Sequence, residues 1–137
     1  MTDPEPARSP RSRAAMIVGW LLRIALALVF AGAGFSKLAG DPAMLQLFDD
    51  VGAGQWLRYV VGALELAGAV GLLVPRLCGL AAAGLVLLMI GATITNIAVL
   101  GVSPAFTLLL LVLAAVVVWL RRRRLNPLVG GDGVRTA

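Results

Sequence analysis

The chain has 137 residues, of which 60% are apolar and 14% are charged, and it contains one Cys and no His. This composition excludes a disordered chain and a disulfide-stabilised one, and it is too apolar for an ordinary soluble domain. The net charge of +5 comes from basic residues grouped near the two ends rather than along one face, which argues against nucleic-acid binding. We therefore expect the lipid bilayer to be the main solvent of the chain.

Four apolar runs are each long enough to cross a bilayer. Membrane spans are expected at about residues 14–36, 56–74, 77–100 and 104–120, because about 20 helical residues cross a hydrocarbon core of about 30 Å. Pro75 separates the second span from the third, and Pro104 follows the third. The sequence therefore predicts an all-α fold, a four-helix transmembrane bundle formed by residues 14–124.

The two ends of the chain differ in composition from the spans. Residues 1–13 are rich in Pro and Arg, so we expect them to form a disordered tail. Residues 125–137 are rich in Gly, so we expect them to form a flexible tail. With four spans, both tails and the loop between the second and third spans share one side of the membrane. The positive-inside rule predicts that this side is cytoplasmic. Its basic residues are Arg8, Arg11, Arg13, Arg76, Arg121–Arg124 and Arg135, whereas Lys37 and Arg58 lie on the other side.

A short amphipathic segment lies between the first two spans. Within residues 42–51, apolar side chains recur on one face and acidic ones on the other. This pattern predicts a short helix on the outer surface of the membrane, with Asp41 as its N-cap and Pro42 at its first position. The apolar positions are Ala43, Met44, Leu47, Phe48 and Val51.

Two ionisable residues lie inside predicted spans, Arg23 in the first and Glu65 in the second. A charge at the middle of a bilayer costs about 2.5 to 3.5 kcal/mol on insertion scales. Arg23 lies nine residues after Ala14, and Glu65 lies nine residues before Val74 on a helix of opposite direction. Both side chains should then lie about 13 to 14 Å from the cytoplasmic edge. An Arg23–Glu65 ion pair between neighbouring helices would lower both costs.

This predicted pair has two interpretations. As structure, it fixes the register and the rotation of the two helices. As function, Glu65 is a proton site or a partner for the polar headgroup of a ligand, and Arg23 keeps the carboxylate ionised until a ligand or a conformational change separates the two. Both interpretations stay open at this point.

A second group of polar residues is expected near the outer face. Lys37 ends the first span, and Arg58 in the second span and Asn96 in the third fall at one level by helical rise. One hypothesis is an apolar pocket covered by the short helix, in which these side chains bind carbonyl oxygens of a ligand. The alternative is that Asp49 or Asp50 neutralises Lys37 or Arg58. The candidate pocket residues are Lys37, Phe48, Arg58, Thr93 and Asn96, and the acidic loop residues are Asp41, Asp49 and Asp50.

Missing residue types narrow the chemistry. Without His there is no imidazole-bound haem, no His-liganded zinc and no Ser-His hydrolase, and the single Cys excludes internal disulfide exchange and Cys-ligated clusters. We therefore expect no metal site, no covalently bound cofactor and no self-contained catalytic constellation. A redox role would need a borrowed cofactor or a diffusible one such as quinone.

Two motifs follow each other along the chain. The first, Gly-x-x-Lys-Leu-x-Gly-x-Pro, spans residues 34–42, and the second, Gly-x-x-Glu-x-x-Gly, spans residues 62–68. Together with Phe48, Gly52 and the Leu-Leu-Val-Pro sequence at 72–75, they resemble the DoxX-like family of small membrane proteins. The resemblance covers about two thirds of the chain, from the first span to the end of the third.

The resemblance implies a four-helix bundle in the bacterial cytoplasmic (inner) membrane. It also implies a link to quinone-coupled oxidoreductases and to membrane complexes that handle sulfur compounds and oxidative stress, with Lys37 and Glu65 on motif positions. Relatives often carry a His late in the third helix, where this chain has Gly91 to Asn96, which puts a His-dependent step in doubt.

The favoured hypothesis is a small subunit or anchor of a quinone-linked membrane oxidoreductase, with a redox enzyme or a second copy of the chain as partner. If the protein is enzymatic, it acts as an oxidoreductase subunit. The alternatives are a proton-coupled transporter or exporter that uses Glu65 and works as a dimer, and a non-catalytic structural membrane partner.

Overall fold

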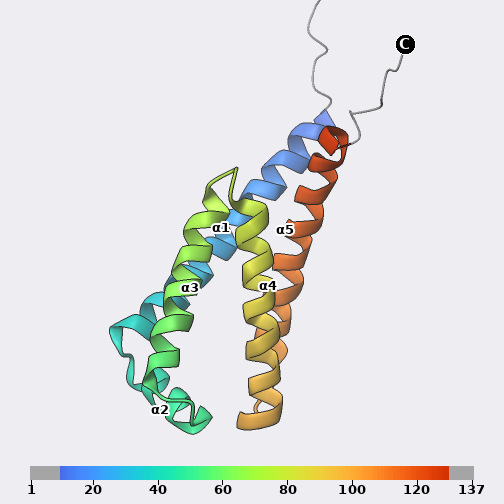
Figure 1. The fold of residues 1–137 in the computed structure, drawn as a ribbon. Coiled ribbons are helices and arrows are strands. Elements are labelled where there is room, and N and C mark those ends of the chain that lie inside the picture. Colours follow the sequence, from blue (N-terminus) through green and yellow to red (C-terminus); the bar gives the residue numbers. More distant parts are fainter. Residues whose placement is uncertain (1–9, 130–137) are drawn as a thin grey trace, which may run out of the picture.

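All regular structure in the described residues is helical, in six segments (Figure 1). The computed structural model describes residues 10–129, with side chains to Arg122. Residues 1–9 and 130–137, the greater part of the two expected tails, lie outside the described residues, whereas residues 10–13 and 125–129 are helical. The elements are α1 (Pro10–Ala39), α2 (Pro42–Val51), α3 (Gln55–Leu73), α4 (Cys78–Thr95), the π-helix η1 (Asn96–Leu100) and α5 (Ala105–Val129).

Four helical stretches in the described part of the chain are long and apolar enough to cross a membrane. They cover Pro10–Ala39, Gln55–Leu73, Cys78–Leu100 and Ala105–Arg122. The predicted all-α fold with four spans is confirmed. Each span begins and ends within about four residues of the expected bounds.

The helices form two antiparallel pairs, which we call the two arms. The first arm is α1 with α3 and carries α2 at one end; the second is α4 and η1 with α5 (Figure 1). The arms contact each other through α3 with α4, through α1 with α5 and, less extensively, through α2 with η1. Their shared apolar core consists of Leu26, Ala27, Phe30, Ala69, Leu72, Cys78, Ala82, Leu85, Met89, Leu110, Ala114 and Val117.

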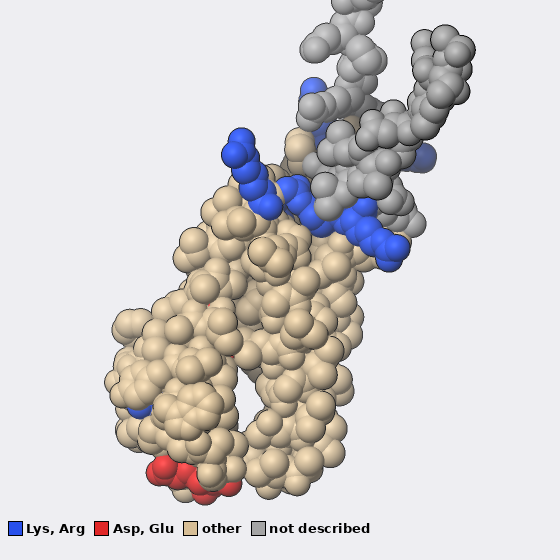
Figure 2. All heavy atoms as spheres, viewed as in Figure 1, with Lys and Arg blue, Asp and Glu red and all other residues tan. Residues whose placement is uncertain are grey.

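This shared core occupies only part of the bundle. In α1 it stops at Phe30, and in α3 it begins at Ala69. Beyond these residues the arms diverge, and Figure 2 shows an opening between them. The molecule is therefore packed as a four-helix bundle toward one end. Toward the other end the opening separates the two helix pairs, which meet again where α2 contacts η1.

The two ends of the bundle carry opposite charge. The end where α1 begins, which also carries Arg76, Arg121 and Arg122, is called the basic end. The end that carries α2 is called the acidic end, and its acidic residues are Asp41, Asp49 and Asp50. Between the two ends, the face seen in Figure 2 is almost free of charged atoms. A belt without charges between two polar ends is what a bilayer-spanning surface requires.

The predicted short helix is present as α2, with the predicted cap. The Asp41 carboxylate accepts a hydrogen bond from the backbone N–H of Ala43 at 2.9 Å, and Pro42 is the first helical residue. The chain reverses just before it at Gly40, whose φ of +76° lies in the left-handed region that favours glycine. The buried residue of α2 is Phe48, and the helix contacts α1, α3 and η1.

Helix α1 extends well past its partner at the basic end. Arg23 contacts the carbonyl oxygen of Leu72, which is the penultimate residue of α3. The part of α1 before Arg23 therefore lies beyond the end of α3 and runs beside α5 (Figure 1). Because of this overhang, Arg23 lies beside the end of α3 and not beside its middle.

Candidate functional site

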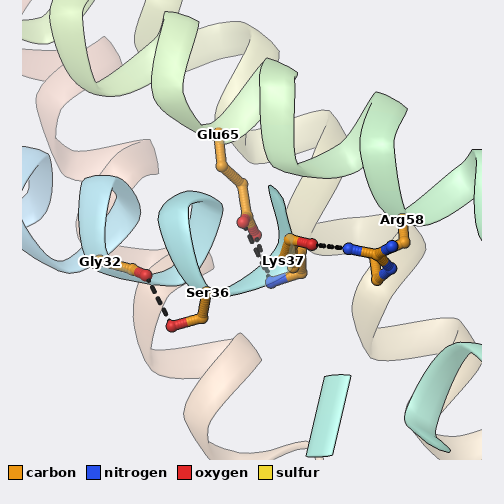
Figure 3. Close-up of polar contacts among 5 residues, drawn as sticks. All are labelled: Gly32, Ser36, Lys37, Arg58 and Glu65. Atoms are coloured by element: carbon orange, nitrogen blue, oxygen red, sulfur yellow. Dashed lines mark hydrogen bonds and ion pairs between the residues drawn. The ribbon is translucent and has the colours of Figure 1, made fainter. Parts of the chain in front are cut away.

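The central feature of the candidate site is a buried ion pair between α1 and α3 (Figure 3). The Lys37 ammonium Nζ lies 3.0 Å from Oε2 of Glu65 and 3.2 Å from Oε1. Glu65 is 3% exposed, and the Lys37 side chain is 14% exposed. A buried charge without a partner is costly in free energy. Each residue of the pair therefore lowers the cost of burying the other.

Two glycines explain why these charges meet. A Cβ on Gly34 would lie 2.8 Å from the carbonyl oxygen of Gly62, so α1 and α3 touch backbone to backbone at this point. Lys37 and Glu65 each follow one of these glycines by three residues and so share its helix face. Side chains on helices lean toward the N-terminus of their own helix. In an antiparallel pair, Lys37 and Glu65 therefore lean toward each other across the glycine contact.

Arg58 supports the pair from the next turns of α3. It is 3% exposed, and its Nη1 donates a hydrogen bond to the backbone carbonyl of Lys37 (Figure 3). Its Nε donates to Oε1 of Gln55 at 2.7 Å. Its guanidinium also lies over the Tyr59 ring, 4.3 Å from the centroid. A cation at the last carbonyls of a helix satisfies them and complements the helix dipole. Arg58 thus fixes the end of α1 that carries Lys37.

The predicted Arg23–Glu65 ion pair is wrong. Nε of Arg23 donates to the carbonyl oxygen of Leu72 at 2.8 Å, and its guanidinium lies 4.2 Å from the centroid of the Trp20 ring. The depth calculation placed Ala14 level with Val74, but α1 extends past α3. Arg23 therefore lies beside the end of α3, about 10 Å along that helix from Glu65.

The other expected pocket residues divide between the arms. Lys37 and Arg58 are brought together, and Phe48 is buried in α2. Thr93 lies on α4, where its hydroxyl donates to the Met89 carbonyl and makes a 3.1 Å hydrogen bond with Thr107 of α5. Thr93 therefore joins the helices of the second arm rather than the Lys37 cluster.

Asn96 also belongs to the second arm. It is the first residue of η1, and its carbonyl oxygen accepts from the backbone N–H groups of Gly101 and Val102. The π-helix is thereby closed at Gly101, whose φ is +61°. Single π-turns occur frequently at functional sites, but Asn96 belongs to the second arm, whereas Lys37 and Arg58 belong to the first.

The acidic residues at α2 do not neutralise Lys37 or Arg58. Asp41 caps α2, and Asp49 accepts a hydrogen bond from Nε2 of Gln55 at 2.7 Å. Asp50 is exposed. Within the described residues, neither Asp49 nor Asp50 forms an ion pair with Lys37 or Arg58, so the charge neutralisation considered above is not formed.

Gln55 is the residue that sequence reasoning missed. Its Nε2 donates to Asp49 and to the backbone carbonyl of Leu45 at 3.1 Å, and its Oε1 accepts from Arg58. One amide therefore ties α2 to the arginine that holds the end of α1. The available signal was the i, i+3 spacing of Gln55 and Arg58, which places both on one helix face.

Replacing Gln55 with leucine should loosen α2 without unfolding the bundle. The change removes three hydrogen bonds and leaves the buried Nε of Arg58 without an acceptor, at an expected cost of about 2 kcal/mol. Hydrogen exchange in residues 42–51 should become faster in detergent micelles, while exchange in α4 stays unchanged. Gln46→Leu is the matched control, because Gln46 is exposed on α2. Equal exchange in both variants would contradict this role of Gln55.

The site offers cationic donors and one buried carboxylate. Among the described residues, no group of three or more His, Cys, Asp or Glu side chains is placed to hold a metal ion. The arrangement can donate hydrogen bonds, stabilise a negative charge and exchange a proton between Lys37 and Glu65.

Four apolar spans, a face almost free of charges between two polar ends (Figure 2) and an ion pair buried inside the bundle define a multi-pass integral membrane protein. The sequence model of the DoxX-like family matches residues 21–120. The chain therefore belongs to the DoxX-like family. Searches of curated proteins and of solved structures found no match.

Proposed function

We propose that the protein is a small quinone-binding subunit, or anchor, of a membrane oxidoreductase complex of sulfur or oxidative-stress metabolism. The observation that carries the proposal is the buried Lys37–Glu65 pair and its position in the bundle. It agrees with the expectation that the family resemblance raised.

The pair lies where the two arms begin to separate. Glu65 is one helical turn from Ala69, and Lys37 is two turns beyond Phe30, the last core residues on α3 and α1. The opening seen in Figure 2 lies in the half of the molecule toward the acidic end. A flat apolar ligand can enter such an opening from the hydrocarbon core and meet the polar pair at its inner end.

The donors and acceptors at the pair fit a quinone headgroup. An ammonium group has three N–H donors, so Lys37 keeps capacity for a carbonyl oxygen beside its contacts with Glu65. Oε2 of Glu65 is buried, ion-paired to Lys37 and receives no hydrogen bond from the described residues, so it can accept one from a hydroxyl group. A bound quinone would accept two electrons and two protons. The electrons would come from a redox centre of the partner enzyme.

The chain's own residues would bind the headgroup and handle protons. Lys37 donates a hydrogen bond to the headgroup, Glu65 holds or releases a proton at Oε2, and Arg58 keeps the backbone of Lys37 in place. Such a site binds a quinone and handles protons, but a partner must provide the redox centre. We therefore assign the protein the role of a subunit.

We further propose that the protein lies in the bacterial cytoplasmic membrane with its basic end in the cytoplasm. The contrast between the basic end and the acidic end (Figure 2) supports this orientation through the positive-inside rule. The site would then open toward the outer leaflet, beneath α2.

The quinone proposal is tested with the purified full chain in nanodiscs and a short-chain menaquinone analogue. We expect saturable binding that Glu65→Gln and Lys37→Gln each weaken about tenfold, the loss of one charge-assisted hydrogen bond. Ser36→Ala is the control, because its hydroxyl donates only to the carbonyl of Gly32 on its own helix (Figure 3). Binding that is absent, or equally strong in all variants, would refute a quinone site at the pair.

A proton-coupled transporter is the second candidate, and one observation favours it. The partner of Glu65 is Lys37, whose ammonium can lose its proton, rather than an arginine that stays charged. A carboxylate and an amine that exchange a proton suit a coupling site. In proteoliposomes with a pH gradient, uptake of a lipophilic cation that Glu65→Gln abolishes and Ser36→Ala leaves intact would favour transport. If both assays fail, the structural membrane partner remains.

A further inference from the structure

A small cavity at the basic end belongs to neither arm alone. It has a volume of about 240 Å³ and lies between α1, the start of α4 and residues 117–121 of α5. Two of its lining residues are cationic, Arg23 and Arg121, and the lining includes no acidic side chain. Most of the remaining wall is apolar, including Met16, Cys78 and Val117.

Arg23 has unused hydrogen-bonding capacity at this cavity. Its Nε is bonded to the carbonyl of Leu72, and its guanidinium lies over Trp20, so these two contacts orient the group. Its Nη2 is buried and has no hydrogen-bond partner among the described residues. A buried donor without an acceptor is costly, and native proteins usually supply the acceptor. The described residues around Arg23 therefore provide no acceptor for Nη2. A ligand in the cavity can provide this acceptor.

The cavity lies at the level where a bilayer places its headgroups. Arg23 is beside the last residues of α3, Cys78 begins α4, and Arg121 is within one residue of the end of the last apolar span. Figure 2 shows basic side chains gathered at this end. The two cationic groups thus lie near this level. On α1 the apolar wall lies between Arg23 and the basic end, whereas on α5 it reaches about one turn deeper than Arg121, to Val117.

We propose that this cavity binds the phosphate of an anionic phospholipid. The two guanidinium groups are suited to phosphate oxygens, and Val117, about one turn deeper on α5 than Arg121, provides an apolar surface for the first part of an acyl chain. A free phosphate ion would use the guanidinium groups but leave this wall without a partner. The lipid would give Nη2 of Arg23 an acceptor after a small shift of the guanidinium, and it would join α1 to α5. This proposal is independent of the proposed quinone site.

The test measures thermal unfolding of the detergent-purified full chain with added dioleoylphosphatidylglycerol, dioleoylphosphatidylcholine or inorganic phosphate. For the wild-type protein, we expect phosphatidylglycerol to raise Tm at a lower concentration than the other two. Arg23→Gln and Arg121→Gln should each raise the half-maximal lipid concentration about tenfold. Arg76→Gln is the matched control, because this exposed arginine lies at the same end but outside the cavity.

Three results would overturn the proposal. Equal weakening by Arg76→Gln would show attraction to surface charge without a pocket. Equal stabilisation by phosphatidylcholine would show that the charge of the headgroup is not recognised, and equal stabilisation by inorganic phosphate would identify the ligand as the free ion. If Arg23→Gln does not fold, Arg121→Gln alone decides between the cavity and the surface.

Discussion

Substitution of Gly34 by valine is expected to destroy the packing of the first arm. Even the Cβ of the new side chain would lie 2.8 Å from the carbonyl oxygen of Gly62 and 3.1 Å from the backbone nitrogen of Leu66. Backbone atoms of a packed helix cannot move aside as a flexible side chain can, so α1 and α3 must separate. We expect a loss of about 3 kcal/mol or more in the free energy of unfolding, measured by thermal or denaturant unfolding in detergent micelles.

Gly32→Val is the matched control for this prediction. Gly32 lies on the same helix two residues earlier, and a Cβ there has nothing within 4 Å. Its effect should stay within about 0.5 kcal/mol, as for other exposed positions. Comparable losses in the two variants would mean that valine harms α1 by itself and that the close approach to Gly62 does not matter.

The second large effect is expected from breaking the buried ion pair on one side only. Lys37→Met leaves the carboxylate of Glu65, which is 3% exposed, without its cation. Removing one partner of a buried pair costs about 3 to 5 kcal/mol, whereas replacing both partners by apolar residues is often neutral or stabilising. We therefore expect Lys37→Met to destabilise the protein strongly and Lys37→Met with Glu65→Met to recover most of the loss.

This double-variant experiment separates structure from function. Arg13→Met controls for the removal of an exposed cation from α1 and should have little effect. If the doubly substituted protein is stable but binds no quinone and transports nothing, the pair serves function rather than folding. A double variant as unstable as Lys37→Met would contradict the account of the pair as two mutually compensating charges.

The spans and the short helix could be predicted because their signals are local. Hydropathy over about 20 residues decides whether a segment can cross a bilayer, and Asp41 with Pro42 decides where α2 begins. These signals need no knowledge of neighbouring helices, and the structure confirms all of them.

The partner of Glu65 could not be predicted from depth. The expected pairing with Arg23 assumed that apolar runs begin at the same level on both helices, but the register of α1 on α3 is set by the Gly34–Gly62 contact. Lys37 was expected to end the first span and to belong to the outer-face group with Arg58 and Asn96, not to pair with Glu65. Its long side chain instead reaches back along α1 to Glu65.

Rotation and divergence of the helices also escaped sequence reasoning. Arg58 and Asn96 were expected to meet because they share a level, yet they lie on different arms. Counting residues gives the height of a side chain along its helix. It does not give the distance between two helices, which depends here on where the apolar core between the arms ends. The hydrogen bonds of Gln55 were missed because a single amide in a loop-to-helix segment has no periodic pattern.

The pairing of the helices has a consequence for how the chain enters the membrane during synthesis. Lys37 and Glu65 are 28 residues apart, and both belong to the first arm, whereas Thr93 and Thr107 of the second arm are 14 residues apart. Each arm can therefore close as a hairpin by itself, and the N-terminal one emerges first from the ribosome. The two charges can neutralise each other before α4 and α5 have entered the membrane. A chain whose first arm has been inserted then already contains its ion pair, and the contacts between the arms form once the second arm follows.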